Sequence, residues 1–145
     1  MKRPTFLLYL LLLCSCHSGP AREDLPMLNG YWQIEEVEAP DGSSREYGVS
    51  ATIDFIALTG MQGFRKKVQP KADGGFLATD DTSFFEIREN EGRFIMSYHT
   101  DYTSWEEELL HLDVDGFSVV NAENITYHYR RFKTVSTTHE PLQKR

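Results

Sequence analysis

From residue 28 onward, apolar and polar side chains alternate with a period of two, and this pattern most constrains the fold. Shorter, less clean runs of the same kind occur at residues 94–99 and 126–131. Successive side chains of a β-strand point to opposite faces, and strands favour β-branched and aromatic residues. The sequence therefore predicts half-buried strands. The clearest run has small or polar residues between its apolar positions, which are Tyr47, Val49, Ala51, Ile53 and Phe55.

Turn signals separate these runs, and each of them contains glycine, which supplies the positive φ that tight turns require. They are Pro40-Asp41-Gly42, Asp73-Gly74-Gly75, Asn90-Glu91-Gly92 and Asp115-Gly116. The expected strands are 30–38, 48–58, 62–69, 75–79, 83–89, 93–99, 105–113, 117–121 and 126–133. Many short strands without a long helical stretch predict an all-β barrel or sandwich. An antiparallel up-and-down meander that closes into an eight-stranded barrel is favoured, because closure removes exposed edges.

One segment of the predicted sheet has two interpretations. Ser104 is followed three residues later by Glu107, which is the spacing of a helix capping box. The leucines at residues 109–112 would then face inward from a short helix. The regular spacing of the neighbouring runs favours a strand at 105–113 instead.

The N-terminus has the pattern of an export signal. Lys2 and Arg3 precede an unbroken apolar run at residues 6–13. This run is far shorter than the ~20 residues needed to cross a bilayer as a helix. It therefore predicts a signal peptide rather than a membrane-spanning helix.

The residues after the apolar run, Leu13-Cys14-Ser15-Cys16, resemble the lipobox of bacterial lipoproteins. Cys16 fits the lipidated position because the small Ser15 precedes it, whereas Cys14 follows the bulky Leu13. The resemblance implies cleavage before Cys16 and acylation of its thiol, so that membrane lipid is an expected partner. His17 follows the cysteine where an aspartate would signal inner-membrane retention. The resemblance thus implies a lipid-anchored protein of the cell envelope, at the outer membrane facing the periplasm; the alternative is an ordinary secreted protein.

These features divide the chain into four parts. Residues 1–15 are the expected lipoprotein signal peptide, and residues 16–27 are the lipidated cysteine with a polar tether. Residues 28–133 form the barrel domain, and the polar residues 134–145 form a C-terminal tail.

The start and the end of the barrel domain carry a second resemblance. Gly30-Tyr31-Trp32 resembles the Gly-x-Trp entry motif of the lipocalins, and the last expected strand has a Tyr127-x-Tyr129-x-Arg131 pattern. The whole chain resembles the small lipocalin-like, calycin-type lipoproteins common in Bacteroidota. The resemblance implies a lipocalin-like barrel in which Arg131 packs on Trp32 and closes one end, with Arg130 as the second candidate. A guanidinium stacked on an indole gains ~0.5–2 kcal/mol.

Charge and motifs argue against several functions. The net charge of -7 disfavours nucleic-acid binding, which needs a basic face. No nucleophile motif or phosphate loop is present, so no enzyme activity, catalytic residue or cofactor is predicted. His99, His111 and His128 lack metal-ligand spacing, and no metal site is predicted. The run at residues 106–108 is interpreted as a solvated acidic face, although alternation turns at least one glutamate the other way. Residues 65–67 are interpreted as a small basic patch.

Two functions remain. The first is binding of a small hydrophobic or amphipathic ligand inside the barrel. The second is a non-catalytic accessory subunit of an envelope complex, bound to a protein partner, whose aromatic residues fill the lumen. Eight-stranded barrels are compatible with both, since they are just wide enough to be filled or to hold one small ligand. The residues expected to line a ligand cavity are Tyr47, Phe55, Phe85, Phe94, Met96, Tyr98, Tyr127 and Tyr129.

Overall fold

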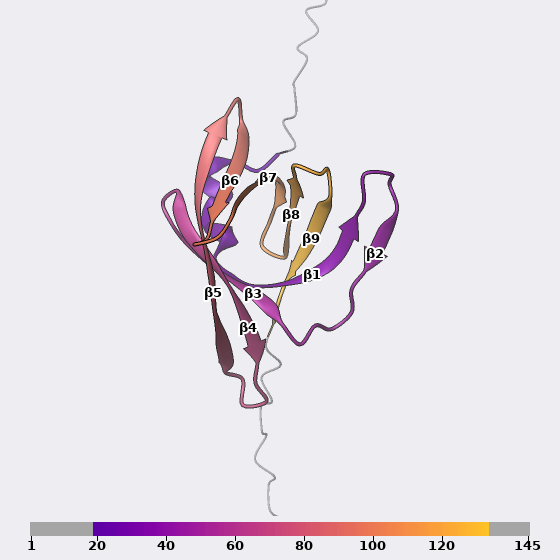
Figure 1. The fold of residues 1–145 in the computed structure, drawn as a ribbon, viewed down its shortest axis with the longest axis vertical. Helices are drawn as coiled ribbons and strands as arrows, with labels where there is room; N and C mark the ends of the chain where they lie inside the picture. Colours follow the sequence, from indigo (N-terminus) through magenta and orange to yellow (C-terminus); the bar gives the residue numbers. More distant parts are fainter. Residues whose placement is uncertain (1–18, 134–145) are drawn as a thin grey trace, which may run out of the picture.

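The structure, a computed structural model, describes residues 19–133. One 3₁₀ helix, η1 (Arg22–Leu28), precedes nine strands. The strands are β1 (Gly30–Glu38), β2 (Ser44–Glu46), β3 (Ile53–Thr59), β4 (Gln62–Pro70), β5 (Phe76–Asn90), β6 (Arg93–His99), β7 (Ser104–Leu112), β8 (Gly116–Asn121) and β9 (Thr126–Arg131). In Figure 1 the β4–β5 arm extends away from the other strands, toward the bottom of the view.

The strands form one antiparallel meander that closes on itself. From β3 to β9 each strand pairs with the next, and β1 pairs with both β3 and β9. Eight strands therefore make a closed barrel, while the short β2 pairs only with the far end of β1. This arrangement confirms the predicted all-β, eight-stranded up-and-down barrel.

Several element bounds differ from those predicted. Residues 104–112 form strand β7, so the helical alternative is wrong. The two strands expected at 75–79 and 83–89 are one continuous strand, β5. The strand expected at 48–58 begins only at Ile53, and residues 47–52 are a loop in which Val49 is 90% exposed. The alternation before Ile53 therefore does not come from burial.

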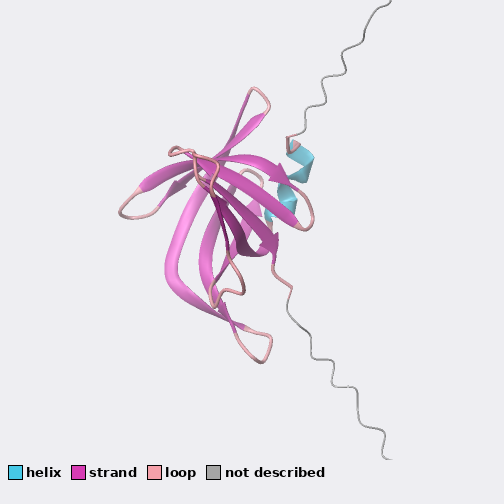
Figure 2. Ribbon diagram, turned by 90° about the vertical axis from the view of Figure 1, so that its right-hand side faces the viewer, coloured by secondary structure: helices cyan, strands magenta, loops and turns pink. Residues whose placement is uncertain are grey.

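The helix η1 was not predicted, and it closes one end of the barrel. Leu25 and Leu28 are buried and pack into the main core. A 3₁₀ helix has three residues per turn, so residues i and i+3 share one face. Figure 2 shows the helix, in cyan, lying against the strands at one side of the molecule. The described fold therefore begins within the segment expected to be a tether.

The core fills the half of the barrel next to η1, which we call the floor half. Its residues come from every strand of the closed barrel except β4 and β9, and all point into the lumen. Gly63 on β4 leaves room there, because a Cβ at this position would lie 2.6 Å from the Phe85 ring. The buried side chains of the floor half are Trp32, Ile56, Phe85, Ile87, Phe94, Met96, Leu109, Leu112, Phe117 and Val119.

The direction of the strands defines the other end, which we call the mouth. β1 runs from the floor to the mouth and β9 returns from the mouth to the floor, with Trp32 paired to Arg131. The connections 39–43, 71–75, 100–103 and 122–125 therefore lie at the mouth. Both ends of the described fold lie at the floor, because η1 leads into β1 there and residues 132–133 follow β9 there.

Candidate ligand-binding site

A cavity of about 590 Å³ opens at the mouth of the barrel. Side chains from β1, β4, β7, β8 and β9 surround it, so it occupies the lumen above the filled floor half. Its lining combines aromatic rings with charged groups, and it is open to solvent. The lining residues are Ile34, Arg65, Lys67, Ser104, Trp105, Glu106, Glu107, Asn121, Ala122, Glu123, Tyr127 and Tyr129.

Two ion pairs lie at the base of this cavity. Arg65 on β4 and Glu107 on β7 both point inward, with 3.4 Å between Nη1 and Oε2. Lys67, also on β4, places its Nζ 2.7 Å from Oδ1 of Asp54 on β3. Asp54 is buried and Glu107 is nearly so, whereas Lys67 is half exposed. The lumen thus contains charged groups where the sequence analysis expected only apolar and aromatic ones.

Aromatic rings hold the Arg65 guanidinium in place. Its Cζ lies 4.5 Å from the centre of the Tyr98 ring and 5.9 Å from that of Trp105. Tyr98 and Trp105 are themselves stacked, with centroids 5.0 Å apart. Stacking on these rings is geometry that a guanidinium, and not an ammonium, provides. Arg65 is therefore a preorganised cation at the base of the cavity.

The ionisation of this cluster is stable near neutral pH. Burial by itself lowers the pKa of Arg65. The neighbouring Tyr98, Tyr129, Glu107 and Asp54 together raise this pKa by more than burial lowers it, so the pKa lies above its ordinary value. Burial raises the pKa of Tyr98 and of Tyr129. Arg65 therefore stays charged, and both phenols stay neutral and able to donate hydrogen bonds.

The predicted lining residues fall into three groups. Tyr127 and Tyr129 line the cavity, and Tyr98 lies directly beneath Arg65. Phe85, Phe94 and Met96 also face the lumen but belong to the packed floor half. They are buried and do not line the cavity, because the lumen below the ion pairs is full.

Tyr47 and Phe55 do not reach the lumen, and their predicted role in lining it is wrong. Tyr47 lies in the loop after β2 and is 41% exposed. Phe55 lies on the outer face of β3, because Asp54 and Ile56 on either side of it point inward. Its ring contacts Tyr31 and Phe64, with centroids 4.9 and 6.0 Å apart. Phe55 therefore belongs to an outer aromatic cluster.

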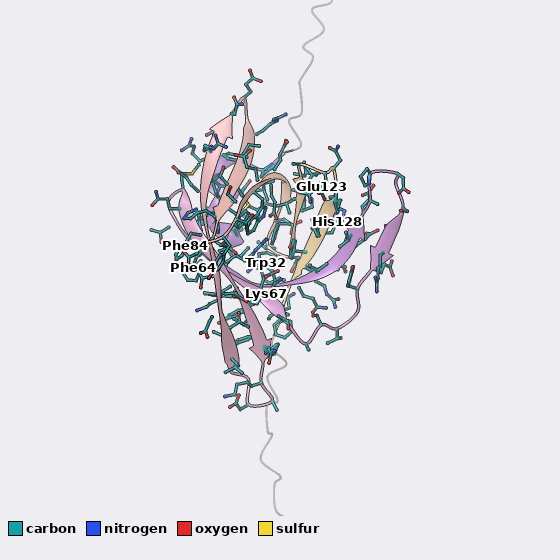
Figure 3. All side chains as sticks on the ribbon, viewed as in Figure 1. Trp32, Phe64, Lys67, Phe84, Glu123 and His128 are labelled. Carbon is teal, nitrogen blue, oxygen red and sulfur yellow. The ribbon has the colours of Figure 1, made fainter. Side chains whose placement is uncertain are left out.

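Except for Glu123, the charged cavity residues that sequence reasoning missed were present in its two charged runs, whereas Trp105 and the other missed lining residues outside these runs gave no signal. Residues 65–67 were interpreted as a surface patch and residues 106–108 as a solvated face. Strand alternation places Arg65 and Lys67 on one face and Glu107 opposite to its neighbours. Figure 3 shows Lys67 near the middle of the view, close to the Trp32 label, and Phe64 and Phe84 at the left-hand side. The informative feature of these two runs is how their charged side chains alternate between the two faces of a strand, not how many charges they contain.

At the floor, the structure brings Trp32 and Arg131 together. The Arg131 Cζ lies 4.0 Å from the centre of the indole ring. The guanidinium also donates to the carbonyls of Val114, Asn29 and Met27, at 2.5, 3.0 and 2.7 Å. The indole N–H of Trp32 donates to the Leu28 carbonyl at 2.8 Å. Arg131 thus ties η1 and the β7–β8 turn to the end of the barrel, while Arg130 points away and is exposed.

The three histidines lie apart. His99 stacks on Phe84, His111 contacts Asp113, and His128 lies 3.6 Å from Glu38. Within residues 19–133, no group of three His, Cys, Asp or Glu side chains is placed to hold a metal ion. In the same part of the chain, no helix has the length and apolar character needed to cross a membrane. Cys16, the signal segment and the tail from residue 134 lie outside the described residues.

A second hollow, of about 620 Å³, lies outside the barrel between the loop containing Val49 and the end of β9. Its lining includes Gln33, Arg130 and Lys133. Volume alone therefore does not select the site. The mouth cavity is the better candidate because most of its walls are inward-facing strand residues held by the closed sheet, whereas Val49 on the outer hollow is almost fully exposed.

Comparison with known proteins gives similarity of fold only. No protein-family model and no curated protein sequence matches the chain. A lipocalin-like protein from Bacteroides uniformis aligns with a TM-score of 0.46 and 15% identity, over 73% of this chain and 99% of its own. Apocrustacyanin C1 aligns with a TM-score of 0.46 and 11% identity, over 76% of this chain and 63% of its own.

Proposed function

We propose that this protein binds a small amphipathic molecule in the mouth of its barrel. The observation that carries the proposal is the cavity of about 590 Å³ above a filled floor half. Ligand sites are typically concave, ~300–1,000 Å³ in volume, and combine aromatic walls with a few fixed polar groups. Trp105, Tyr127 and Ile34 supply the walls, and Arg65 and Lys67 supply the polar groups. The barrel is thus neither hollow throughout nor completely filled.

The proposal includes a lipid anchor at Cys16. The lipobox resemblance at residues 13–16 supports it, together with the preceding signal pattern. Two acyl chains anchor a protein stably, whereas one binds only marginally. The protein would then act in the cell envelope as a tethered, non-catalytic carrier.

Native mass spectrometry tests ligand binding. The chain from residue 17 onward is secreted in its own host without the anchoring cysteine and purified gently. An adduct of discrete small-molecule mass that is lost on denaturation is the expected result. A control variant, Ala122→Trp, places a large ring on the rim of the cavity and should lose the adduct while keeping the fold. If the chain from residue 17 onward, without the Ala122→Trp substitution, shows only the mass of the polypeptide, the carrier proposal is contradicted.

A second candidate function is supported by the outer aromatic cluster, which consists of Tyr31, Phe55, Phe64, Phe76 and Phe132. Near it on β5, Phe84 is 52% exposed, which is unusual for so large an apolar ring. Aromatic side chains are enriched in protein interfaces. The accessory-subunit alternative would use this face. Cross-linking in intact cells tests it: a specific partner that is captured from wild type but not from Phe84→Ser would support it.

A further inference from the structure

Arg65 at the base of the mouth cavity has hydrogen-bond donors that no residue between 19 and 133 accepts. Its side chain is 15% exposed. Within residues 19–133, its one polar contact is the 3.4 Å approach of Nη1 to Glu107 Oε2. A guanidinium has five N–H donors in a planar fork. A buried charge is stable only when its hydrogen-bonding groups find partners. The remaining donors of Arg65 therefore call for an acceptor in the cavity.

The acidic groups nearby are already engaged by the protein. Glu107 Oε1 accepts the indole N–H of Trp105 at 3.0 Å, and its Oε2 faces Arg65. Asp54 Oδ1 lies 2.7 Å from Lys67 Nζ, which makes an ion pair by distance, although the contact lacks the geometry of a hydrogen bond. Two further carboxylates lie at the cavity. Glu106 binds Arg88 on the outer face, and Glu123 lies on the exposed rim. The base of the cavity therefore has no carboxylate placed to use the free donors of Arg65.

Other donors face the same space. Lys67 is half exposed, and among the described residues its ammonium contacts only Asp54, so it has further N–H groups available. The hydroxyls of Tyr127 and Tyr129 make no hydrogen bond to any residue between 19 and 133, and both residues line the cavity. Trp105, Ile34 and Ala122 supply apolar surface nearer the rim. The cavity thus offers donors at its base and apolar contacts above them.

We infer that the molecule bound in this cavity is an organic acid, whose carboxylate lies against Arg65 and Lys67 and whose apolar body lies against Trp105 and Tyr127. A guanidinium matches a carboxylate with two parallel hydrogen bonds, and such charge-assisted bonds are roughly twice as strong as neutral ones. The stacking of Arg65 on Tyr98 fixes the fork before the ligand arrives, which lowers the entropic cost of binding. This inference rests on the proposed ligand-binding function and specifies its chemistry.

Two fluorescent probes that share one ring system test the inference. They are 8-anilinonaphthalene-1-sulfonate and N-phenyl-1-naphthylamine, which lacks the sulfonate. The chain from residue 17 onward, stripped of ligand by unfolding and refolding, should bind the anionic probe about tenfold more tightly than the neutral one. Decanoate should displace the anionic probe at lower concentration than decan-1-ol does. Equal affinity for the two probes would overturn the inference.

The variants are chosen to avoid an unpaired buried charge. Removing Arg65 alone would leave Glu107 buried without a counter-ion, and folding could fail. Glu107→Gln is therefore compared with Arg65→Gln/Glu107→Gln, since both lack the acid and differ only in Arg65. The single variant should keep the preference for the anionic probe. The double variant should lose most of it, with Lys67 retaining a remainder, while it binds the neutral probe as before. An undiminished preference in the double variant would contradict the role of Arg65.

Ala122→Trp separates failure of the inference from failure of the proposed function. A ring at this rim position should weaken both probes if they enter the cavity. If both probes bind the variant as they bind wild type, they occupy another surface, and the proposed function fails. If the variant excludes both probes but wild type shows no anion preference, the cavity binds ligands and only the inference fails. Circular dichroism and thermal unfolding verify that every variant folds.

Discussion

Gly30 and Arg131 illustrate how single residues close the floor of the barrel. Gly30 has φ +133°, and a Cβ at this position would lie 2.5 Å from Arg131 Nη1. That nitrogen donates to the Asn29 carbonyl, and the same guanidinium covers the Trp32 ring. The glycine therefore serves two needs: a backbone conformation that side chains disfavour, and room for a cation stacked on the indole.

Gly30→Ala is expected to destabilise the protein by about 1–3 kcal/mol for backbone strain, and by more through displacement of Arg131. The measurement is the free energy of unfolding by urea. Gly74→Ala is the matched control, because Gly74 has φ +84° but a Cβ added to it would meet nothing within 4 Å. Equal losses in the two variants would show that the contact with Arg131 adds nothing beyond strain.

Single residues also show what the sequence can reveal about the site. Alternation alone requires that one glutamate of residues 106–108 turn inward, and Glu107 does. Alternation does not say which face of a strand is the lumen. That choice depends on the pairing of β7 with its neighbours, which brings Glu107 opposite Arg65 across 42 residues of chain. Phe55 was misplaced for the same reason, since alternation at residues 47–55 did not show that the lumen lies on the face of Asp54 and Ile56.

At the scale of elements, the β7–β8 turn shows how one side chain fixes a hairpin. Asp113 Oδ1 accepts the backbone N–H groups of Asp115 and Gly116, both at 2.8 Å. Its Oδ2 lies 2.8 Å from His111 Nε2. The backbone N–H of Asp115, followed by the His111 side chain and the Gly116 N–H, holds the pKa of Asp113 below its ordinary value. The motif is a hairpin turn, as its sequence predicts.

This lowered pKa gives a stability term with a definite pH dependence. A carboxylate whose pKa is depressed on folding stabilises the native state above its unfolded pKa of about 4, and loses that effect as pH falls through the folded value. Asp113→Ala should therefore lower the unfolding temperature at pH 7, and the gap to wild type should narrow below about pH 4.

Thermal unfolding from pH 7 to pH 2.5 measures this gap. Asp113→Asn is the control, because its amide oxygen still accepts the two backbone bonds but does not titrate. The unfolding temperature of Asp113→Asn should lie closer to that of wild type at pH 7. Its difference from wild type should not show the full change with acid. A gap between Asp113→Ala and wild type that stays constant with pH would contradict the assignment.

The elements that sequence reasoning missed lie where burial does not follow a period of two. β5 is one strand of 15 residues, but its middle, at residues 80–83, is polar because both faces of the β4–β5 arm meet solvent there. β2 consists of three exposed residues and carries no apolar signal. Leu25 and Leu28 have a spacing of three, which indicates a 3₁₀ helix only once a surface exists to bury them. The remaining strands and their turns could be predicted, since half-burial produces alternation directly.

At the scale of the whole molecule, the two halves of the lumen differ: the floor half is packed, and the mouth half contains the proposed binding site. The floor half contains the main core, together with η1 and the Trp32–Arg131 contact. The mouth half contains the ion pairs and the cavity. Substitutions at the mouth that leave the two ion pairs intact should therefore cost less folding stability than substitutions at the floor. A small barrel has few residues for its core, so it benefits when the packed residues and the cavity residues are kept apart.

Cys16→Ser is expected to move the protein from the membrane fraction to the soluble fraction, because the proposed acyl chains would supply the binding energy to lipid. Fractionation of the host cells followed by immunoblotting measures this. Cys14→Ser is the matched control: it removes the other thiol of the segment and should remain with the membranes. Release by Cys14→Ser, or retention by Cys16→Ser, would contradict the proposed anchor.

The position of the chain ends has a consequence for how cargo would arrive. Both ends of the described fold lie at the floor, opposite the cavity. An anchor at Cys16 would therefore hold the closed end nearest the bilayer and direct the entrance toward the aqueous phase. Cargo would then be taken up from solution or from a facing surface rather than by lateral transfer from the lipid beneath. A fluorophore on Ala122 that is quenched by lipid-borne nitroxide would show the reverse orientation.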